Sequence, residues 1–247
     1  MRVLAWNILH GGGPSRLPEI ALDVLDARPD VVVLSEFRPG RGGQLRAVLA
    51  DQGLPHQSCS GESPTRNAIL LASRWPLSVD DAGEGLAANL KPRLHAAVVD
   101  HPAGPVAVLG VHIPDDSNPS GKAHVWRAVL DYAKPRAAGR TVIAGDTNSG
   151  RHGTDDPAGR LGCVTALGHL AMMGYADAWR ARHPESRERS WSGPKWGTKW
   201  GPFGESARID GVYLSRVLAA SVVEAELRHG PRDAGHSDHS MVLVEVG

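Results

Sequence analysis

The chain has 247 residues, which is enough for one large domain or two small ones and for a substantial hydrophobic core. Lysine plus arginine and aspartate plus glutamate each number 27, so the net charge is zero and no overall field attracts polyanions. Any contact with nucleic acid must therefore use a local positive patch. The two cysteines, Cys59 and Cys163, cannot build a disulfide framework and lie in no metal-binding cysteine pattern.

The first ten residues contain an apolar run that Asn7 and His10 interrupt too early for a signal peptide. No apolar stretch of the sequence reaches the length of a transmembrane helix. We therefore expect a cytoplasmic protein without a transmembrane segment. We also expect a monomer, with residues 1–247 forming a single catalytic domain.

The first half of the chain predicts strands and helices in an irregular order. Apolar residues at helical spacing follow residue 17, and a β-branched run at residues 31–34 is typical of a strand covered on both faces. A second short helix is expected near residues 45–49. Strands are expected at residues 2–8, 31–34, 68–73, 94–100 and 106–112.

The second half predicts helices at residues 123–133 and 163–173 and a long loop at 190–204. Strands are expected at residues 141–144, 208–215, 221–228 and 241–246. Helices and strands do not alternate regularly, and no glycine fingerprint opens a helix. A mixed-sheet α/β domain therefore fits better than a Rossmann fold.

Polar side chains that can bind a metal or move a proton lie at or near the ends of these strands. They are Asn7, Glu36, His112, Asp146, Asn148, Asp210, Asp238 and His239. Any one of them alone is explained as well by a solvent-facing or loop-capping role. Together they favour a site, because α/β sheets bind ligands at strand ends.

Metal binding is the first chemistry that this set of residues predicts. Glu36 and Asp238 offer the hard oxygen ligands that Mg²⁺ or Mn²⁺ prefers, and Asn7, Asp146 and Asn148 can complete the coordination sphere. The absence of a cysteine ligand pattern disfavours structural zinc.

Proton transfer is the second chemistry. His239 can move a proton near neutral pH, and Asp210 can fix the tautomer of its ring.

Five short motifs occur in order along the chain: Trp6-Asn7, Leu34-Ser35-Glu36, Gly145-Asp146-Thr147-Asn148, Arg208-Ile209-Asp210 and Ser237-Asp238-His239. They resemble the ordered signatures of the endonuclease/exonuclease/phosphatase family. The resemblance spans nearly the whole chain, and the order of the motifs makes it specific. The resemblance implies a four-layer α/β sandwich with two facing mixed β-sheets flanked by helices. It also implies hydrolysis of phosphoesters that depends on Mg²⁺, with Mn²⁺ as a possible substitute.

The same resemblance implies roles for individual residues. Glu36 is then the main metal ligand, assisted by Asn7 and Asp238, and Asp210 pairs with the imidazole of His239.

The resemblance also implies how the substrate is attacked. Asp146 and Asn148 face the scissile phosphate, and water attacks in line after activation by His239 or by Asp146. The metal, Asn148 and His112 stabilise the charge on the phosphoryl oxygens. Which of the two residues is the base stays open at this point.

The sequence mixes the patterns of two subfamilies. His112 resembles deoxyribonuclease-I-like enzymes and lipid or inositol phosphatases, whereas Pro114, Lys122 and the pair Ser190-Trp191 resemble exonuclease-III-type repair nucleases. Thr147 replaces the bulky apolar residue usual in its motif, and the neighbouring ligands are kept.

The loop at residues 190–204 is rich in tryptophan and lysine and is a candidate substrate-binding segment. Its residues Trp191, Lys195, Trp196, Lys199 and Trp200 can stack on bases and follow phosphates. The alternative is that the indoles pack on the sheet edge with solvated lysines around them.

Three functions follow from these observations. The first is a DNA endonuclease or exonuclease, of repair type if it acts at abasic or damaged sites. The second is a phosphatase or phosphodiesterase for a lipid headgroup or a small soluble phosphoester. The third is a binding module without catalysis, which the full set of metal and proton-transfer residues makes the weakest of the three.

Overall fold

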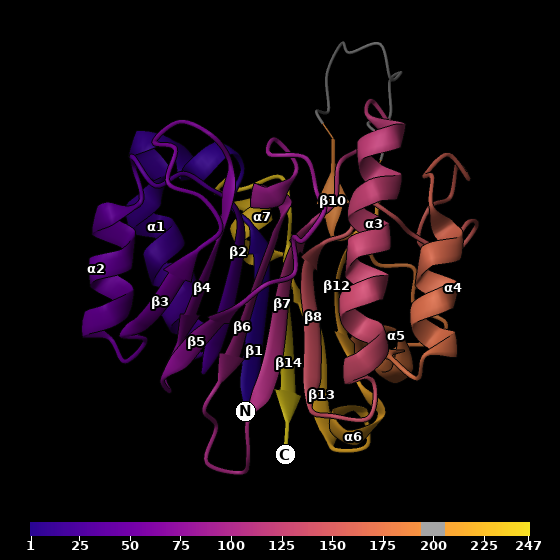
Figure 1. Ribbon diagram of the computed structural model, residues 1–247. Coiled ribbons are helices and arrows are strands. Elements are labelled where there is room, and N and C mark those ends of the chain that lie inside the picture. The colour runs from indigo at the N-terminus through magenta and orange to yellow at the C-terminus, as the bar shows by residue number, and fades with distance from the viewer. Residues whose placement is uncertain (194–205) are drawn as a thin grey trace.

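Two mixed β-sheets face one another in the computed structural model, which describes residues 1–193 and 206–247 (Figure 1). In this part of the chain, one six-stranded sheet has the order β13-β14-β1-β2-β4-β3 and the other β5-β6-β7-β8-β12-β9. Strands β1 and β2 run parallel, as do β7 and β8, and the remaining pairs within these sheets are antiparallel. Helices cover both outer faces, so the expected four-layer sandwich is confirmed.

The strands of the first sheet are β1 (Arg2–Asn7), β2 (Val31–Phe37), β3 (His56–Cys59), β4 (Ala68–Ser73), β13 (Val222–Arg228) and β14 (Met241–Val246). Those of the second are β5 (Leu77–Asp80), β6 (Leu94–Val99), β7 (Val106–His112), β8 (Thr141–Asp146), β9 (Ala176–Asp177) and β12 (Asp210–Leu214). A short separate pair is formed by β10 (Trp191–Ser192) and β11 (Ser206–Ala207).

The α-helices are α1 (Gly13–Asp26), α2 (Gly43–Asp51), α3 (Pro119–Ala133), α4 (Val164–Met172), α5 (Ala178–Arg182), α6 (Arg216–Ala219) and α7 (Gly230–Asp233). Short 3₁₀ turns lie at His10–Gly12, Lys91–Arg93 and Lys134–Arg136. No helix among these is long and apolar enough to cross a membrane.

Three apolar layers hold the sandwich together. Alternate residues of both sheets, such as Val33 and Val108, meet in the central layer, because successive side chains of a strand point to opposite faces. The opposite face of the first sheet packs on α1, indigo in Figure 1, and α2, purple there, through residues such as Trp6. The opposite face of the second packs on α3 and α4 through residues such as Trp126.

Most expected elements are present close to their predicted bounds. The strands expected at residues 68–73, 106–112 and 241–246 have those bounds in the structure. Helix α3 begins four residues earlier than predicted, because the side chain of Asn118 accepts the backbone N–H of Gly121 and Pro119 suits the first turn. The loop expected at 190–204 is corrected at its start, since Trp191 and Ser192 pair with β11.

The parallel strands of both sheets end at one edge of the sandwich, opposite the two chain termini (Figure 1). Asn7 closes β1 there and Asp146 closes β8. Gly145 permits this end of β8, because its φ of 137° and a clash of any Cβ with the carbonyl oxygen of Val111 exclude other residues. This edge carries the candidate site.

Candidate active site

The pairing of strands brings the predicted residues of both sheets together. Asp146 lies between two cross-strand neighbours, with His112 of β7 on one side and Asp210 of β12 on the other. In the facing sheet, Asn7 ends β1 beside β2, which carries Glu36. Residues far apart in the sequence therefore share one buried cluster.

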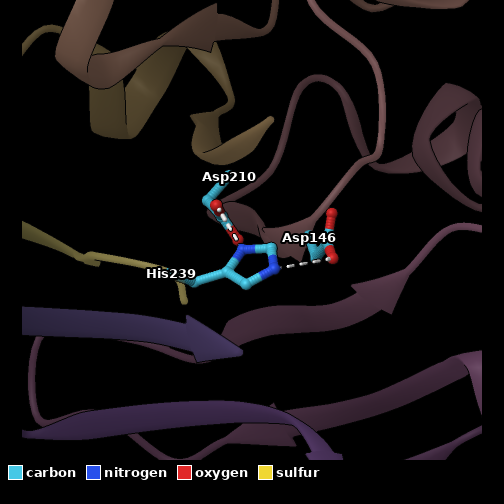
Figure 2. A group of neighbouring side chains, drawn as sticks. All are labelled: Asp146, Asp210 and His239. Atoms are coloured by element: carbon cyan, nitrogen blue, oxygen red, sulfur yellow. Dashed lines mark hydrogen bonds and ion pairs between the residues drawn. The ribbon is translucent and has the colours of Figure 1, made fainter. Parts of the chain in front are cut away.

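His239 lies between two carboxylates, as Figure 2 shows. Its Nδ1 is 2.9 Å from Oδ2 of Asp210, and its Nε2 is 4.0 Å from Oδ2 of Asp146. All three residues are at most 5% exposed. The bond to Asp210 fixes the ring and places the proton of Nδ1, so that Nε2 faces Asp146. The expected pairing of Asp210 with His239 is present.

Asn7 connects the two sheets at the centre of the site. Its Nδ2 lies 3.0 Å from Oδ2 of Asp146 and 3.3 Å from Oε1 of Glu36, and its Oδ1 accepts the backbone N–H of Leu9. The amide thus donates to two carboxylates and holds them side by side. Its role as a metal ligand stays a prediction.

Glu36 adopts a left-handed backbone conformation, with a φ of 58°, where the pairing of β2 with β4 is irregular. Such a conformation is costly for a residue other than glycine and is common at functional sites. Its Oε2 accepts the backbone N–H of His10 at 2.7 Å and lies 2.8 Å from the ring Nδ1 of His10. Burial raises the pKa of Glu36, but the His112 ring and the bonds from His10 and Asn7 bring it below its ordinary value.

His112 faces both acidic residues of the centre. Its Nε2 is 3.7 Å from Oε1 of Glu36 and 3.9 Å from Oδ2 of Asp146. Nη1 of Arg93 lies 3.2 Å and 3.1 Å from the two ring nitrogens, so the guanidinium rests against the ring face and points along neither lone pair. Burial, and then the charge of Arg93, lowers the pKa of His112 to about 3. The ring is therefore neutral at physiological pH.

Asn148 is held by a turn that follows β8. Its backbone N–H donates to Oδ1 of Asp146 at 2.9 Å, and its Nδ2 donates to the carbonyl oxygen of Ile113 at 2.9 Å. Nζ of the buried Lys122 donates to the carbonyl oxygen of Asn148 at 2.6 Å and to Asp116 at 2.9 Å. The side chain of Asn148 is thus fixed beside Asp146.

Asp238 completes the set through its neighbours. Its Oδ1 is buried, lies 3.8 Å from Nε2 of His239 and has no hydrogen-bond partner in the part of the chain that the structure describes. Its Oδ2 accepts the indole N–H of Trp191 at 3.1 Å. Ser190 donates its hydroxyl to Oδ2 of Asp210 at 2.7 Å.

Burial and mutual repulsion set the charges of the centre. Burial, and then the charge of Asp210, raises the pKa of Asp146 to about 7. Burial alone lowers the pKa of His239, but the facing carboxylate of Asp210 and its hydrogen bond outweigh this and raise it to about 10. A buried carboxylate that resists ionisation is stabilised by an added cation.

The donors of this cluster fit a divalent cation. One oxygen each of Asp146 and Asp210 lies within 4.8 Å of the other and of a ring nitrogen of His239, and Oδ1 of both Asp210 and Asp238 is buried without a hydrogen-bond partner among the described residues. Buried polar atoms of this kind normally have partners. Carboxylate oxygens dominate the set, which suits Mg²⁺ or Mn²⁺.

Sequence reasoning missed His10, Arg93 and Ser190 and did not assign Trp191 to Asp238. His10 follows Asn7 closely and is the only one with a local signal. The other contacts join distant segments and involve residue types that are common on surfaces. The predicted substrate-binding residues Lys195, Trp196, Lys199 and Trp200 lie outside the described residues.

The sequence model of the endonuclease/exonuclease/phosphatase family matches residues 4–239, which includes every residue of this site. The chain belongs to that family. None of the curated proteins compared with the chain matches it. The family assignment makes the chain a phosphoesterase with a buried Asp–His–Asp centre, and it explains why motifs spread over the whole sequence converge on one edge.

Several solved structures share the fold over the whole chain. The 3′ phosphatase NExo from Neisseria, bound to a product DNA hairpin, has a TM-score of 0.84 at 24% identity, covering 100% of this chain and 99% of that one. An AP endonuclease from Archaeoglobus fulgidus has a TM-score of 0.81 at 20% identity with the same coverage. An endonuclease/exonuclease/phosphatase protein from Beutenbergia cavernae has a TM-score of 0.70 at 24% identity, covering 100% of this chain and 72% of that one.

Proposed function

We propose that this phosphoesterase is a metal-dependent phosphodiester hydrolase that acts on DNA, with Mg²⁺ as its cofactor and Mn²⁺ as a substitute. The observation that carries the proposal is the position of His239 between Asp210 and Asp146, in a buried cluster whose carboxylates include oxygens without a partner among the described residues. A centre of this kind combines an oriented proton carrier with oxygen ligands for a cation.

Glu36 and Asp238 are the residues we expect to hold the cation, with Asn7, Asp146 and Asn148 around it. A bound Mg²⁺ supplies neutralising charge at the phosphoryl oxygens. The protein holds its own acidic groups in place for this, since Asn7 donates to Asp146 and to Glu36 at 3.0 and 3.3 Å.

The pKa directions favour Asp146 over His239 as the group that accepts the proton of the attacking water. The raised pKa of His239 keeps both ring nitrogens protonated at neutral pH. The imidazolium therefore suits a hydrogen-bond donor to the phosphoryl oxygen. The pKa of Asp146 near 7 suits a base, because catalytic bases work best near the operating pH. The neutral His112 adds a hydrogen-bond donor on the other side of Asp146.

DNA is favoured as the substrate by two observations. Two of the structures with the same fold are described as a 3′ phosphatase bound to DNA and an AP endonuclease. Trp191 lies half-buried at the site, at the start of the predicted tryptophan- and lysine-rich loop. The alternative, a phosphatase or phosphodiesterase for a lipid headgroup or small phosphoester, is favoured by His112, which matches the pattern of those members of the family.

A panel of substrates tests this proposal. We expect Mg²⁺-dependent cleavage of labelled duplex DNA, compared as an intact duplex, a duplex with one abasic site and a duplex with a 3′-terminal phosphate. Glu36→Gln protein is the control for contaminating nucleases. Hydrolysis of a small phosphodiester or an inositol phosphate, with every DNA left intact in Mg²⁺ and in Mn²⁺, would contradict the nuclease proposal and support the alternative.

The predicted loop provides a second comparison. Trp196→Ala and Lys199→Ala are expected to slow hydrolysis of DNA and to leave a small phosphodiester unaffected, because stacking and phosphate contacts matter for a nucleic acid strand. Equal losses on both substrates would count against a role of this loop in binding DNA.

A further inference from the structure

Trp191 is fixed against the site by backbone contacts on both sides. The backbone N–H of Ser192 donates to the carbonyl oxygen of Asp238 at 3.1 Å, and that of Ser240 donates to the carbonyl oxygen of Ser190 at 2.6 Å. Trp191 therefore lies opposite His239 as an isolated bridge pair. The position of its indole relative to Asp238 is set by the backbone.

The indole N–H of Trp191 binds one carboxylate oxygen of Asp238 and leaves the other without a contact to the indole. It donates to Oδ2 at 3.1 Å, and the indole side chain has no other polar atom. The second oxygen, Oδ1, is buried, lies 3.8 Å from Nε2 of His239 and accepts no hydrogen bond from residues 1–193 or 206–247. A carboxylate held at one oxygen has its plane fixed, so the other keeps a constant direction.

The same segment holds the neighbouring acidic residue in a similar way. The buried hydroxyl of Ser190 donates to Oδ2 of Asp210, which also accepts from His239. Oδ1 of Asp210 has no hydrogen-bond partner within the described segments. Ser190 is itself fixed by the backbone N–H groups of Ile209 and Asp210, both 3.0 Å from its hydroxyl oxygen. Two adjacent residues of one segment thus each leave a neighbouring carboxylate with one free oxygen.

We propose that Trp191 is a positioning residue of the metal centre, whose indole N–H holds Oδ2 of Asp238 and so keeps Oδ1 free for the cation. This rests on the proposed metal-dependent function and goes beyond it, because it gives Trp191 a role in metal affinity. The sequence had suggested that this indole stacks on a base of the substrate. Partners that orient metal ligands typically change metal affinity 10- to 100-fold when they are removed.

Trp191→Phe separates the two roles, because phenylalanine keeps an aromatic face and lacks the N–H. We expect Mn²⁺ binding, measured by calorimetry or by the electron paramagnetic resonance of free Mn²⁺, to weaken about tenfold in this variant. The KM for labelled DNA at saturating Mn²⁺ is expected to stay unchanged. Trp75→Phe is the matched control, since Trp75 packs on His101 beyond the end of β4 that points away from the site.

A double-mutant cycle with Asp238→Ala shows whether Trp191 acts through Asp238. We expect Trp191→Phe to change Mn²⁺ affinity little once Asp238 is absent, because the two residues share one contact. The positioning role of Trp191 would be overturned if Trp191→Phe protein bound Mn²⁺ as tightly as the wild type. It would also be overturned if Trp191→Phe reduced Mn²⁺ affinity equally with and without Asp238→Ala. Neither result would touch the proposed metal dependence. Absence of Mn²⁺ binding by the wild type would overturn the positioning role together with the proposed metal dependence.

Discussion

Arg208 and Asp210 lie two residues apart, yet they belong to buried polar clusters of opposite character. Arg208 joins Arg180, Asp155 and Asp177 in a group of two cations and two anions. Nε of Arg208 lies 2.8 Å from Asp155, its Nη2 lies 2.6 Å from Asp177, and each of the four carboxylate oxygens accepts a hydrogen bond. The carboxylates of this cluster are therefore satisfied without a ligand, and its one buried atom without a partner among the described residues is a donor, Nε of Arg180.

The cluster around Asp210 lacks both this balance of charges and this full set of hydrogen bonds to its carboxylate oxygens. Acidic side chains outnumber cationic ones around His239, and the pKa of Asp146 is raised because the carboxylates are buried near one another. One oxygen of Asp210 and one of Asp238 have no hydrogen-bond partner among the residues that the structure describes. The comparison teaches that charge balance and satisfied oxygens distinguish a structural polar cluster from one that awaits a cation and a substrate.

Breaking the balanced cluster is expected to have the largest effect on stability. Arg208→Met should reduce the free energy of unfolding by about 3–5 kcal/mol, because it leaves Asp155 and Asp177 buried without their main cation. Urea unfolding measures this change. Arg182→Met, at an exposed position of the short helix α5, is the control and should change stability by less than about 0.5 kcal/mol. Equal free energies of unfolding for Arg208→Met and Arg182→Met would contradict the claim that the Arg208 cluster stabilises the fold.

Removing one charge from the acidic cluster is expected to increase the free energy of unfolding, by less than the decrease expected for Arg208→Met. The pKa of Asp146 in the folded state, about 7, lies above its ordinary value of 3.8, so folding disfavours the ionised form. In EDTA, Asp146→Asn should therefore gain stability relative to the wild type as pH rises from about 4 to 7, reaching on the order of 1–2 kcal/mol at pH 8. The variant should lose hydrolysis.

Unfolding curves at pH 4 and pH 8 check this expectation. A destabilised Asp146→Asn protein at pH 8 would show that the carboxylate supports the fold, and the two clusters would then have the same character.

Much of this architecture could be predicted from the sequence because the informative residues lie at strand ends. Asn7, Glu36, Asp146 and Asp210 follow or open apolar runs, and parallel strands place such residues at one edge of a sheet. The four-layer arrangement is predicted only through the resemblance of the ordered motifs to the family, since local patterns cannot show how two sheets face each other.

The features that escaped prediction depend on contacts between distant segments. Strands β3 and β5 lie at sheet edges and have half-exposed polar residues, so they lack the apolar pattern of a central strand. The bond of Ser190 to Asp210 and that of Trp191 to Asp238 form only when two loops meet. A serine or a tryptophan in a loop carries no signal of its partner, so such orienting contacts need coordinates.

The most direct test of the central claim is the rate of Mg²⁺-dependent DNA cleavage by wild-type and His239→Ala proteins of equal thermal stability. The account predicts activity in the wild type that EDTA abolishes, and a loss of about 10²–10⁴-fold in the variant, since its proton carrier between Asp210 and Asp146 is gone. Equal rates in the two proteins would contradict the assignment of this cluster as the catalytic centre.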